Sequence, residues 1–432
     1  MRAVNIGMVG MGTVGGATLR ILDENAAEIE RRCGFPIWVR AAASLEVEAR
    51  SEENNRLLSR DWREVVEHPD VEIIVEVVGG TTIAYEVQKA ALERGRPVVT
   101  ANKELLGLRG AELAQLAAEH KAALHMEASC GGGIPILNAL REGIAADRIE
   151  AVYGILNGTC NFILTEMEKT GAPFASILAE AQKRGYAEAN PTADVEGYDA
   201  RSKLAILAAF CFGARVPTDA IFREGITRIG PTDFSYAHRL GYTIRLIAGA
   251  TRGPAGLALF VRPVLVPQTA MLSKVQGSYN AVWVKGAYGE DTLYYGRGAG
   301  KPTGVAVVSD IIRAARDLRT GANLRAPSFA FWRLEEVTRA AIDSQLRPYY
   351  LRFLVDDRVG IIAQLASALA EQKINIDAVL EEPGQESHNL PFMISVKPAT
   401  EAALAAALET MKKFDFLCEP PLALPMETSL AG

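Results

Sequence analysis

Near its N-terminus the chain reads VNIGMVGMGTVGGATLR over residues 4–20. The apolar run Val4–Val9 predicts a buried strand, and the glycines behind it, Gly10, Gly12 and Gly15, have the G-x-G-x-x-G spacing that opens a helix. Such glycines permit a tight turn and let the backbone approach a pyrophosphate, which then lies at the positive end of the helix dipole. The alternative is a glycine-rich turn without a ligand. The position of the motif behind a first strand favours a dinucleotide site.

The N-terminal part of the chain alternates apolar strand runs with helical stretches. Strands are expected at residues 4–9, 38–43, 73–78 and 97–100, and helices from about Thr13 and over residues 85–94. This alternation is typical of βαβ units around a parallel sheet. The sequence therefore predicts an α/β protein whose residues 1–130 form a Rossmann-like dinucleotide-binding domain.

The end of the second predicted strand does not reveal which dinucleotide is bound. An acidic side chain there would bind the ribose 2′-hydroxyl of NAD, and an arginine would favour the 2′-phosphate of NADP. The strand ends instead in Ala43 and Ser44, with Glu46 and Arg50 just beyond. The choice between NAD and NADP stays open at this point.

Residues 131–318 show a different order of elements. A helix is expected after Pro135, strands near residues 149–156 and 257–266, and helices at residues 175–183 and 200–212. This mixed order predicts an α+β substrate domain. Residues 303–318 are apolar at helical spacing, so we expect them to pack back onto the nucleotide domain. Residues 319–347 are expected to be a linker region.

The C-terminal residues 348–425 have the pattern of a compact βαββαβ unit. Strands are expected at residues 349–355, 375–380 and 390–396, and helices at residues 360–372 and 401–411. About 75 residues are enough for a ferredoxin-like module. The sequence therefore predicts a small, separate domain at this end of the chain.

The composition excludes several classes of protein. At 432 residues, with 49% apolar and 23% charged residues, the chain resembles a globular protein of roughly three domains. The net charge of −6 and the lack of a basic stripe give no reason to expect nucleic acid. The longest apolar stretches, such as residues 204–212, are far shorter than the ~20 residues of a membrane helix. No charged leader with a cleavage site opens the chain, which predicts a cytoplasmic protein. Five scattered cysteines without C-x-x-C spacing predict neither disulfides nor a zinc site.

Two lysines stand where a bound substrate could meet them. Lys103 follows the predicted strand that ends at Thr100, and the carboxyl ends of parallel strands face the ligand crevice. Asp199 and Lys203 are four residues apart and share a helix face, at the head of the apolar run 204–210. A solvated lysine and a surface ion pair are the alternatives. The apolar helix behind Lys203 favours burial of the pair.

Together, these segments resemble those of homoserine dehydrogenases over residues 1–318. The resemblance rests on GMGTVG at residues 10–15, TANK at 100–103, EASCGGGIP at 127–135, NGT at 157–159, the acidic segment 188–203, and GAG at 298–300 before Pro302 and Thr303. It implies an NAD(P)-dependent enzyme that interconverts L-homoserine and L-aspartate 4-semialdehyde, in the biosynthesis of threonine, methionine and isoleucine. It also implies that residues 131–318 serve as a catalytic and dimerisation domain.

The resemblance implies roles for individual residues. Lys203 is the implied proton donor and acceptor, with Lys103 beside it and Asp199 orienting the substrate or the lysine. The implied substrate contacts are Glu188, which would hold the amino group, Asp194, Gly158 and Thr159. The implied contacts of the nicotinamide cofactor are Gly10, Gly12, Thr13, Val14, Gly15, Thr100, Lys103 and Gly300. A monovalent, sodium-like cation (Na+) is implied at Glu127 and at the backbone carbonyls of Cys130, Gly132 and Ile134.

The chemistry of an alcohol oxidation agrees with these roles. The hydroxyl proton must be removed when hydride departs to the nicotinamide. A lysine takes that proton only when a fraction of it is neutral. Burial and the neighbouring Lys103 favour the neutral form of Lys203, whereas Asp199 favours the charged form. In the reverse direction a protonated lysine stabilises negative charge that develops on the aldehyde oxygen.

Two rival functions stay open. The segment ASCG at residues 128–131 resembles the loop of semialdehyde dehydrogenases, in which a nucleophilic cysteine, here Cys130, becomes acylated before hydride transfer. Such a mechanism needs a histidine as base, and the sequence does not place His125 against the thiol. The second rival is an amino-acid-sensing protein with a catalytically silent nucleotide domain. The lysines and carboxylates argue against it.

The C-terminal unit resembles ACT domains. The resemblance rests on the D-x-x-G turn from Asp357 to Gly360 and on INI at residues 374–376, around Asn375. A glycine at such a turn lets the amides of a helix N-terminus approach an amino-acid carboxylate. The resemblance therefore implies an effector site at Asp357, Gly360 and Asn375, with L-threonine as the effector. ACT domains pair across chains, which implies a homodimer or homotetramer. A purely structural dimerisation module is the alternative.

Overall fold

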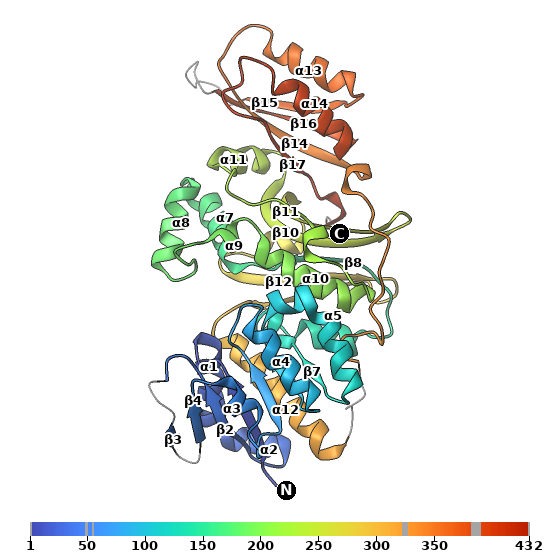
Figure 1. Ribbon diagram of the computed structural model, residues 1–432. Coiled ribbons are helices and arrows are strands. Elements are labelled where there is room, and N and C mark those ends of the chain that lie inside the picture. Colours follow the sequence, from blue (N-terminus) through green and yellow to red (C-terminus); the bar gives the residue numbers. More distant parts are fainter. Residues whose placement is uncertain (1, 48–50, 54–55, 322–326, 382–389, 431–432) are drawn as a thin grey trace. The chain divides into compact units, whose positions relative to one another are not determined.

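The computed structural model describes residues 2–47, 51–53, 56–321, 327–381 and 390–430 (Figure 1). The chain divides into two units, each built from separate segments. The first unit contains Met1–Val152, Asp199–Ile221 and Asn280–Val337, and the second contains Tyr153–Tyr198, Phe222–Tyr279 and Thr338–Gly432. Among the described residues, no helix combines the length and the hydrophobicity that crossing a membrane requires.

A seven-stranded sheet forms the centre of the first unit, in the order β3-β4-β2-β1-β5-β6-β7. Its strands are β1 (Val4–Val9), β2 (Ile37–Ala43), β3 (Ser51–Glu53), β4 (Arg56–Ser59), β5 (Ile73–Glu76), β6 (Val98–Thr100) and β7 (Leu124–His125). All neighbouring strands pair in parallel except β3, which is antiparallel to β4 at the edge. The predicted Rossmann-like sheet is confirmed, although β5 ends at Glu76 rather than at residue 78.

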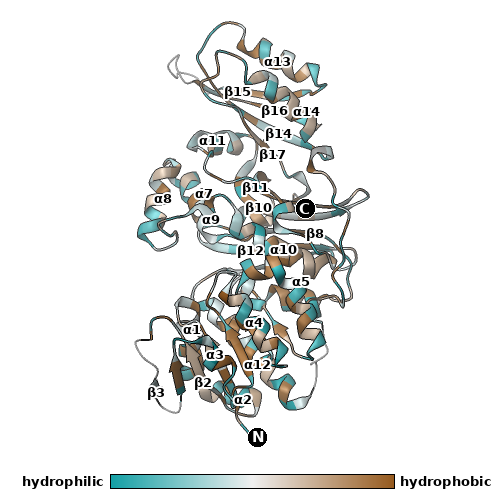
Figure 2. Ribbon diagram, viewed as in Figure 1, coloured by the Kyte–Doolittle hydropathy of each residue, from teal (hydrophilic) through white to brown (hydrophobic). Residues whose placement is uncertain are grey.

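Helices surround this sheet and leave its strands buried. The helices of the first unit are α1 (Thr13–Glu24), α2 (Ala26–Cys33), α3 (Trp62–Val66), α4 (Ile83–Glu93), α5 (Lys103–Glu119), α6 (Ile136–Asn138), the π-helical turn η2 (Ala139–Gly143), α10 (Tyr198–Phe212) and α12 (Lys301–Thr320). Ile73, Ile74 and Val75 of β5 are fully buried, as expected for a parallel sheet with both faces covered. Figure 2 shows mostly hydrophobic residues along these strands, whereas the helices mix hydrophobic and hydrophilic residues.

Helix α12 comes from far along the chain and packs against α1. Gly304 permits the close approach, because a Cβ atom there would lie 3.1 Å from Cβ of Ala17. Val307, Ile311 and other side chains of α12 join one apolar core with residues of β1, β2 and β5. Full burial of an aliphatic side chain contributes about 1.5–3 kcal/mol, so α12 supplies a large part of the stability of this core.

A long hairpin forms the frame of the second unit. Strands β10 (Tyr242–Gly253) and β11 (Gly256–Pro267) pair antiparallel along their whole length, and β9 (Phe222–Arg223) pairs parallel with β11 at Phe260. The helices of this unit outside the C-terminal module are α7 (Gly158–Thr170), α8 (Phe174–Lys183), α9 (Thr192–Val195) and α11 (Pro231–Arg239). The remaining strands before the C-terminal module are β8 (Ile149–Ile155), which spans the boundary between the two units in the sequence, β12 (Tyr279–Gly286) and β13 (Asp291–Arg297). The expected α+β order is confirmed.

The C-terminal module is a four-stranded antiparallel sheet with two helices. Its elements are β14 (Leu346–Val355), α13 (Ile361–Glu371), β15 (Ile376–Glu381), β16 (Leu390–Thr400), α14 (Glu401–Met411) and β17 (Leu422–Pro425). The strand order is β15-β16-β14-β17, with antiparallel neighbours throughout. Both helices contribute to a single apolar core with the strands. This is the predicted ferredoxin-like βαββαβ arrangement, which is confirmed.

Candidate active site

The glycine-rich turn after β1 has the geometry of a phosphate cradle. Gly10 has φ +104°, and a Cβ atom there would lie 2.6 Å from the backbone of Val77. A Cβ atom at Gly15 would lie 2.2 Å from the carbonyl oxygen of Gly10, so only glycine fits at either position. Gly12, by contrast, has open space around it. The turn therefore offers exposed backbone where a ligand could approach.

Helix α1 begins directly at this turn. Gly12 is its N-cap and provides no side-chain hydrogen bond, so the first N–H groups of the helix, at Thr13, Val14 and Gly15, have no partner within the helix. Such groups and the helix dipole bind phosphate oxygens. The residues present fit the pyrophosphate of a dinucleotide. The strand end that would distinguish NAD from NADP carries only Ser44, whose hydroxyl accepts the N–H of Glu46 at 3.2 Å. Arg50 lies outside the described residues.

A buried polar network shapes the loop that carries Thr100 and Lys103. Thr100 donates to the Glu76 carboxylate at 2.8 Å, and Gln88 donates to the same carboxylate oxygen at 2.7 Å. The N–H of Asn102 donates to the Thr100 hydroxyl at 3.0 Å, and the side chain of Asn102 caps α5 by accepting the N–H of Leu105. These bonds fix the first residue of α5, Lys103, at the end of β6. Sequence reasoning missed Glu76 and Gln88, although an acid at the end of an apolar strand is a usable signal.

The first unit brings Lys103, Asp199 and Lys203 together. Nζ of Lys203 lies 2.7 Å from one carboxylate oxygen of Asp199, and Nζ of Lys103 lies 2.8 Å from the other. The side chains of Lys203 and Asp199 are only 9% and 8% exposed, whereas that of Lys103 is 44% exposed. Asp199 is therefore a buried anion between two cations, one of which reaches solvent.

A glycine lets the two helices of this cluster approach each other. Gly107 lies one turn after Lys103 in α5, and a Cβ atom there would lie 3.0 Å from Thr218 and 3.5 Å from the carbonyl oxygen of Ser202 in α10. A larger side chain would push α5 away from the chain that carries Asp199. Apolar burial of α10 from Leu204 onward holds the other side of the cluster.

Electrostatics keep Asp199 ionised. Burial alone would raise the pKa of its carboxyl group, but the charges of Lys203 and Lys103 and their hydrogen bonds hold that pKa well below its ordinary value. The arrangement therefore places a permanent negative charge beside the ammonium group of Lys203.

Cys130 lies near the cluster of Lys103, Asp199 and Lys203, but it lacks the features of a nucleophile. Its side chain is fully buried, and burial raises the pKa of the thiol to about 12. Among the described residues, neither ring nitrogen of His125 has a hydrogen-bond partner, so this histidine does not contact the thiol as a base. Burial also lowers the pKa of His125 to about 3. A thiolate at Cys130 is therefore strongly disfavoured.

The predicted cation site centres on Glu127, which is buried in the 3-10 turn Glu127–Ser129. Its carboxylate accepts the backbone N–H groups of Leu137 at 2.9 Å and Asn138 at 2.7 Å. Burial and the nearby Asp310 raise the pKa of Glu127 to about 7. The described residues contain no cluster of three His, Cys, Asp or Glu side chains that could hold a metal ion. A carboxylate with backbone carbonyls instead forms an oxygen donor set that suits a hard cation.

The backbone of Cys130, Gly132 and Ile134 follows Glu127 in a tight loop. Gly132 has φ +58°, and a Cβ atom there would lie 2.3 Å from the carbonyl group of Gly298. The loop therefore packs against the turn that leads to Gly300, the N-cap of α12 with φ +80°. The first unit thus contains the predicted cofactor, lysine and cation residues.

The predicted substrate residues belong to the second unit. Asn157 caps α7 by accepting the N–H of Cys160 at 2.8 Å, and its amide donates to the carboxylate of Asp194 at 2.7 Å. Gly158 is the first residue of α7, and Thr159 donates to the carbonyl oxygen of Tyr186 at 2.6 Å. Glu188 is exposed, and Gln182 donates to its backbone carbonyl. Asp194 and the NGT turn are thus held together.

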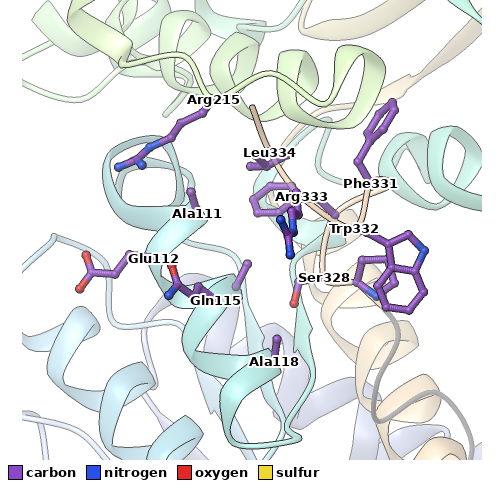
Figure 3. A pocket seen from close by; sticks show the side chains of 13 residues that line it. Ala111, Glu112, Gln115, Ala118, Arg215, Ser328, Phe331, Trp332, Arg333 and Leu334 are labelled. Carbon is purple, nitrogen blue, oxygen red and sulfur yellow. The ribbon is translucent and has the colours of Figure 1, made fainter. Parts of the chain in front are cut away.

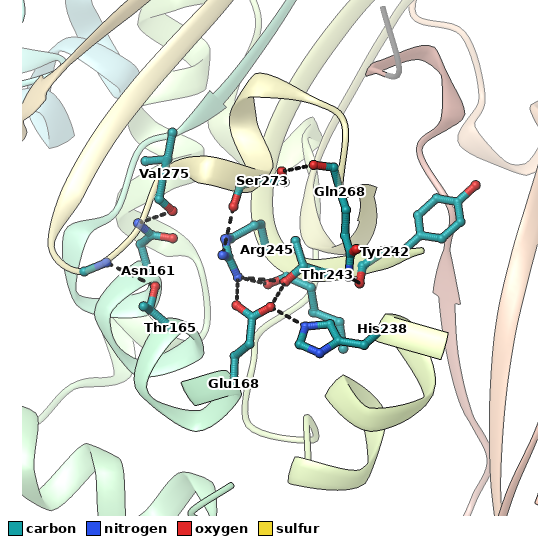
Figure 4. Close-up of polar contacts among 12 residues, drawn as sticks. Asn161, Thr165, Glu168, His238, Tyr242, Thr243, Arg245, Gln268, Ser273 and Val275 are labelled. Carbon is teal, nitrogen blue, oxygen red and sulfur yellow. Dashed lines mark hydrogen bonds and ion pairs between the residues drawn. The ribbon is translucent and has the colours of Figure 1, made fainter. Parts of the chain in front are cut away.

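Helix α7, which begins at this turn, is anchored at its other end by a buried ion pair (Figure 4). The carboxylate of Glu168 lies 2.8 Å from Nη1 of Arg245 and 2.7 Å from Nε2 of His238, and it accepts the Thr243 hydroxyl at 2.5 Å. Arg245 also donates to the carbonyl oxygen of Ser273 at 3.0 Å. Sequence reasoning missed this cluster, because its residues are far apart in the chain.

The C-terminal module has a small cavity of about 180 Å³ at the turn between β14 and α13. Asp357 and Gly360 line it, together with Arg358 and Phe392. Asn375, the third predicted effector residue, lies just before β15 and is not among its lining residues. The structure thus brings two of the three predicted residues to one cavity.

Another cavity, of about 740 Å³, lies beside α5 in the first unit (Figure 3). Glu112 and Gln115 of α5, Arg215, Phe331 and Trp332 are among its lining residues. None of the predicted site residues line it, so its size alone does not make it the active site.

The chain matches known families over most of its length. Residues 135–312 match the family described as homoserine dehydrogenase, residues 10–127 match its NAD binding domain, and residues 349–416 match the ACT domain. A homoserine dehydrogenase of Neisseria gonorrhoeae is 40% identical over 432 residues, or 99% of each chain. The crystal structure of a homoserine dehydrogenase from Thiobacillus denitrificans has a TM-score of 0.90 at 37% identity and covers 98% of each chain. A hyperthermophilic archaeal homoserine dehydrogenase mutant in complex with NADPH has a TM-score of 0.63 at 27% identity, covering 72% of this chain and 97% of that chain.

Proposed function

The chain belongs to the homoserine dehydrogenase family of NAD(P)-binding oxidoreductases, and we propose that Lys203 exchanges the proton when it interconverts L-homoserine and L-aspartate 4-semialdehyde. The observation that carries this proposal is the buried bridge in which Asp199 contacts Lys203 at 2.7 Å and Lys103 at 2.8 Å. The relative with bound NADPH supports the same use of a nicotinamide dinucleotide here.

Each member of the bridge has a separate task. Lys203 takes the hydroxyl proton of homoserine and, in the reverse direction, donates it to the aldehyde oxygen. Asp199 fixes the direction of the Lys203 ammonium group. Lys103 reaches solvent, and it either relays the proton or balances the negative charge of Asp199. The bound cofactor supplies the hydride chemistry of its nicotinamide ring. The Gly10–Gly15 turn and Thr100 would hold that cofactor.

The substrate contacts are part of the same proposal. Glu188 is an exposed carboxylate that could pair with the ammonium group of the substrate. Asp194, Gly158 and Thr159 are linked through the Asn157 side chain and the start of α7, which gives them a fixed mutual geometry. We assign these four residues to binding of the four-carbon amino acid.

Replacement of the central lysine tests the function. Lys203→Ala should lower kcat for homoserine oxidation by about 10²–10⁴-fold, the usual contribution of a positioned acid or base. The apparent affinity for NAD+ and NADP+, measured by fluorescence titration, should change little because the glycine turn is intact. Lys89→Ala, in an exposed pair with Glu93, is the matched control and should keep full activity. Wild-type turnover in Lys203→Ala would refute the role.

The same assay decides between the rival functions. A catalytically silent sensor would show no nicotinamide absorbance change with homoserine in the wild-type protein. A cysteine-dependent semialdehyde dehydrogenase would lose activity in Cys130→Ser, whereas the proton exchange proposed here leaves that variant active. The raised pKa of the Cys130 thiol supports retained activity in Cys130→Ser.

A monovalent cation is proposed at Glu127. Burial and the neighbouring Asp310 disfavour the charge of its carboxylate, which a bound cation would stabilise, and the carbonyl oxygens of Cys130, Gly132 and Ile134 are suitable further ligands. Exchange of the wild-type protein into choline buffer should lower its melting temperature or activity, and added Na+ should restore it. An equal melting temperature and an equal activity in choline and in Na+ would exclude the cation site.

The C-terminal module is proposed to bind L-threonine and to join chains into a homodimer or homotetramer. The cavity beside Asp357 and Gly360 supports an amino-acid site at the start of α13. Threonine should inhibit the wild type, and Asp357→Ala should raise the inhibitory concentration, whereas Glu371→Ala at the far end of α13 should not. Light scattering gives the molar mass in solution and so decides between a homodimer and a homotetramer. A threonine-insensitive wild type would contradict the effector assignment.

A further inference from the structure

A buried arginine connects three elements of the second unit. The side chain of Arg262, in β11, is only 7% exposed. Its Nη1 lies 2.9 Å from both carboxylate oxygens of Glu401, and its Nη2 lies 3.4 Å from the carboxylate of Glu224. The guanidinium carbon also lies 4.7 Å from the ring centre of Phe222. A buried guanidinium needs such partners, because an unpaired charge in the interior is costly.

One partner ties Arg262 to the C-terminal module. Glu401 is the first residue of α14, whose N-cap Thr400 accepts the N–H of Ala403. Helix α14 packs against α13, the helix that begins at the cavity beside Gly360. Helix α13 is therefore connected to the helix of Glu401 by a direct helix–helix contact.

The other partner ties Arg262 to the segment that carries Asp194. The N–H of Glu224 donates to the carbonyl oxygen of Val261 at 2.8 Å, which places β9 and its turn against β11. The N–H of Ile226 donates to the carbonyl oxygen of Val195 at 2.9 Å, next to Asp194. The turn after β9 thus bonds to β11 and to α9.

Close packing makes this turn stiff. A Cβ atom at Gly225 would lie 2.7 Å from the carbonyl oxygen of Val195, and one at Gly197 would lie 3.1 Å from the side chain of Val261. Arg223 donates to the backbone carbonyl of Glu196. The segment 194–197 has little room to move independently of β9 and β11.

We propose that the cluster of Arg262, Glu401 and Glu224 couples the C-terminal module to the substrate segment 194–197, so that the position of α14 sets the affinity for the amino-acid substrate. Arg262 and Glu401 are positioning residues in this proposal and do not touch the substrate. Loss of the Glu401 charge removes the closest ionic partner of Arg262, which weakens the hold of Arg262 on Glu224 and on the turn after β9, and with it on Asp194. The proposal rests on the substrate role of Asp194 proposed above.

The test compares two glutamates of the same helix in the full chain. Glu401→Gln removes the negative charge that faces Arg262, and Glu409→Gln on the exposed side of α14 removes only the charge that pairs with Lys412. Hydrogen–deuterium exchange should accelerate in peptides that cover residues 192–198 in Glu401→Gln but not in Glu409→Gln. The KM for homoserine should rise by roughly 5–150-fold, the range of typical couplings between sites, with kcat and the KM for NAD(P)+ nearly unchanged.

Further variants separate coupling from general loss of structure. Arg262→Lys keeps the positive charge and should show a smaller rise in KM than Arg262→Gln. It also provides a folded variant if Glu401→Gln unfolds. The double variant Arg262→Gln with Glu401→Gln should be no worse than Arg262→Gln alone, because both changes break the same contact.

Two results would overturn the coupling. One is equal exchange at residues 192–198 in the wild type, Glu401→Gln and Arg262→Lys. The other is faster exchange in Glu401→Gln together with an unchanged KM in an active enzyme. A wild type that does not oxidise homoserine would instead overturn the proposed function, and the exchange measurement would still decide whether the contact controls the segment.

Discussion

At the scale of single residues, the carboxylate of Asp199 shows how opposing electrostatic effects combine. Burial disfavours its charge, yet two ammonium groups within 2.8 Å outweigh that penalty and lower the pKa of the carboxyl group. A lowered pKa means that Asp199 stabilises the fold fully above the ordinary aspartate pKa of about 3.9 and loses that contribution only as the pH falls through the lower folded value. Protonation of Asp199 is therefore not what limits this site near neutral pH.

Glu168 should matter mainly for stability. Burial alone would raise the pKa of its carboxyl group, but Arg245, Thr243 and His238 lower it overall. Glu168→Gln leaves the guanidinium of Arg245, which is 1% exposed, without its carboxylate and should cost roughly 3–5 kcal/mol of unfolding free energy. Urea unfolding at pH 7 measures the loss.

The pH dependence of that loss has a definite sign. Because the pKa of Glu168 is lowered in the folded state, its contribution is complete above the ordinary glutamate value of about 4.3 and fades as the pH falls below it. The difference between wild type and Glu168→Gln should therefore shrink in acid. Glu180→Gln, in an exposed pair with Arg184, should match the wild type throughout. A loss that grows in acid would contradict this account.

Local spacing predicts some of these contacts and not others. The Asp199–Lys203 pair follows from a separation of one helical turn, and the glycine turn follows from its motif. Glu76 and Gln88 could not be paired with Thr100 from the sequence, because they lie on different elements that only the parallel sheet brings together. The same holds for Arg245, which lies on strand β10, because its partner Glu168 comes from helix α7.

At the scale of elements, hydrophobic periodicity predicts long helices and strands well. The strands around the glycine turn, helix α10 and the ferredoxin-like order were predictable because each is a long apolar run or repeats an apolar pattern over several residues. The two-residue strand β9 and the π-helical turn η2 were not, because neither is long enough to show a period. Both depend on contacts made after the chain has folded.

The contact between α5 and α10 should be sensitive to side-chain size. Gly107→Val adds methyl groups where even a Cβ atom would lie 3.0 Å from Thr218, and such overpacking costs about 1–3 kcal/mol. The displacement separates Lys103 from Asp199, so kcat should fall together with the melting temperature. Gly143→Ala, which meets nothing within 4 Å, is the control and should keep both. Full kcat in Gly107→Val would show that the close approach is not needed.

At the scale of the whole molecule, neither unit corresponds to one continuous stretch of chain. The nucleotide-binding sheet is complete by residue 125, but its core also includes α12, which ends at Thr320. The expected domain 1–130 therefore describes the sheet and not all of its packing. Residues 303–318 were expected to pack onto the nucleotide domain, and α12 does supply side chains to its core.

A fragment experiment tests the contribution of α12. Residues 1–152 alone expose the surface that Val307 and Ile311 cover, a loss comparable with the about 5–15 kcal/mol of net stability of a domain. The fragment should lack a cooperative thermal transition in circular dichroism. The same fragment joined through a flexible linker to residues 300–321 should regain one. Equal transitions in the two would show that α12 is dispensable.

The return of α12 to the first sheet also bears on biosynthesis. A nascent chain emerges from the ribosome in order, so the glycine turn is made early while the helix that covers α1 and its strands is made only after the whole hairpin of β10 and β11. Until then the apolar surface that Val307 and Ile311 cover has no permanent cover. Slow translation before residue 301 would prolong that exposure, and chaperones that bind apolar segments would have their longest access during this interval.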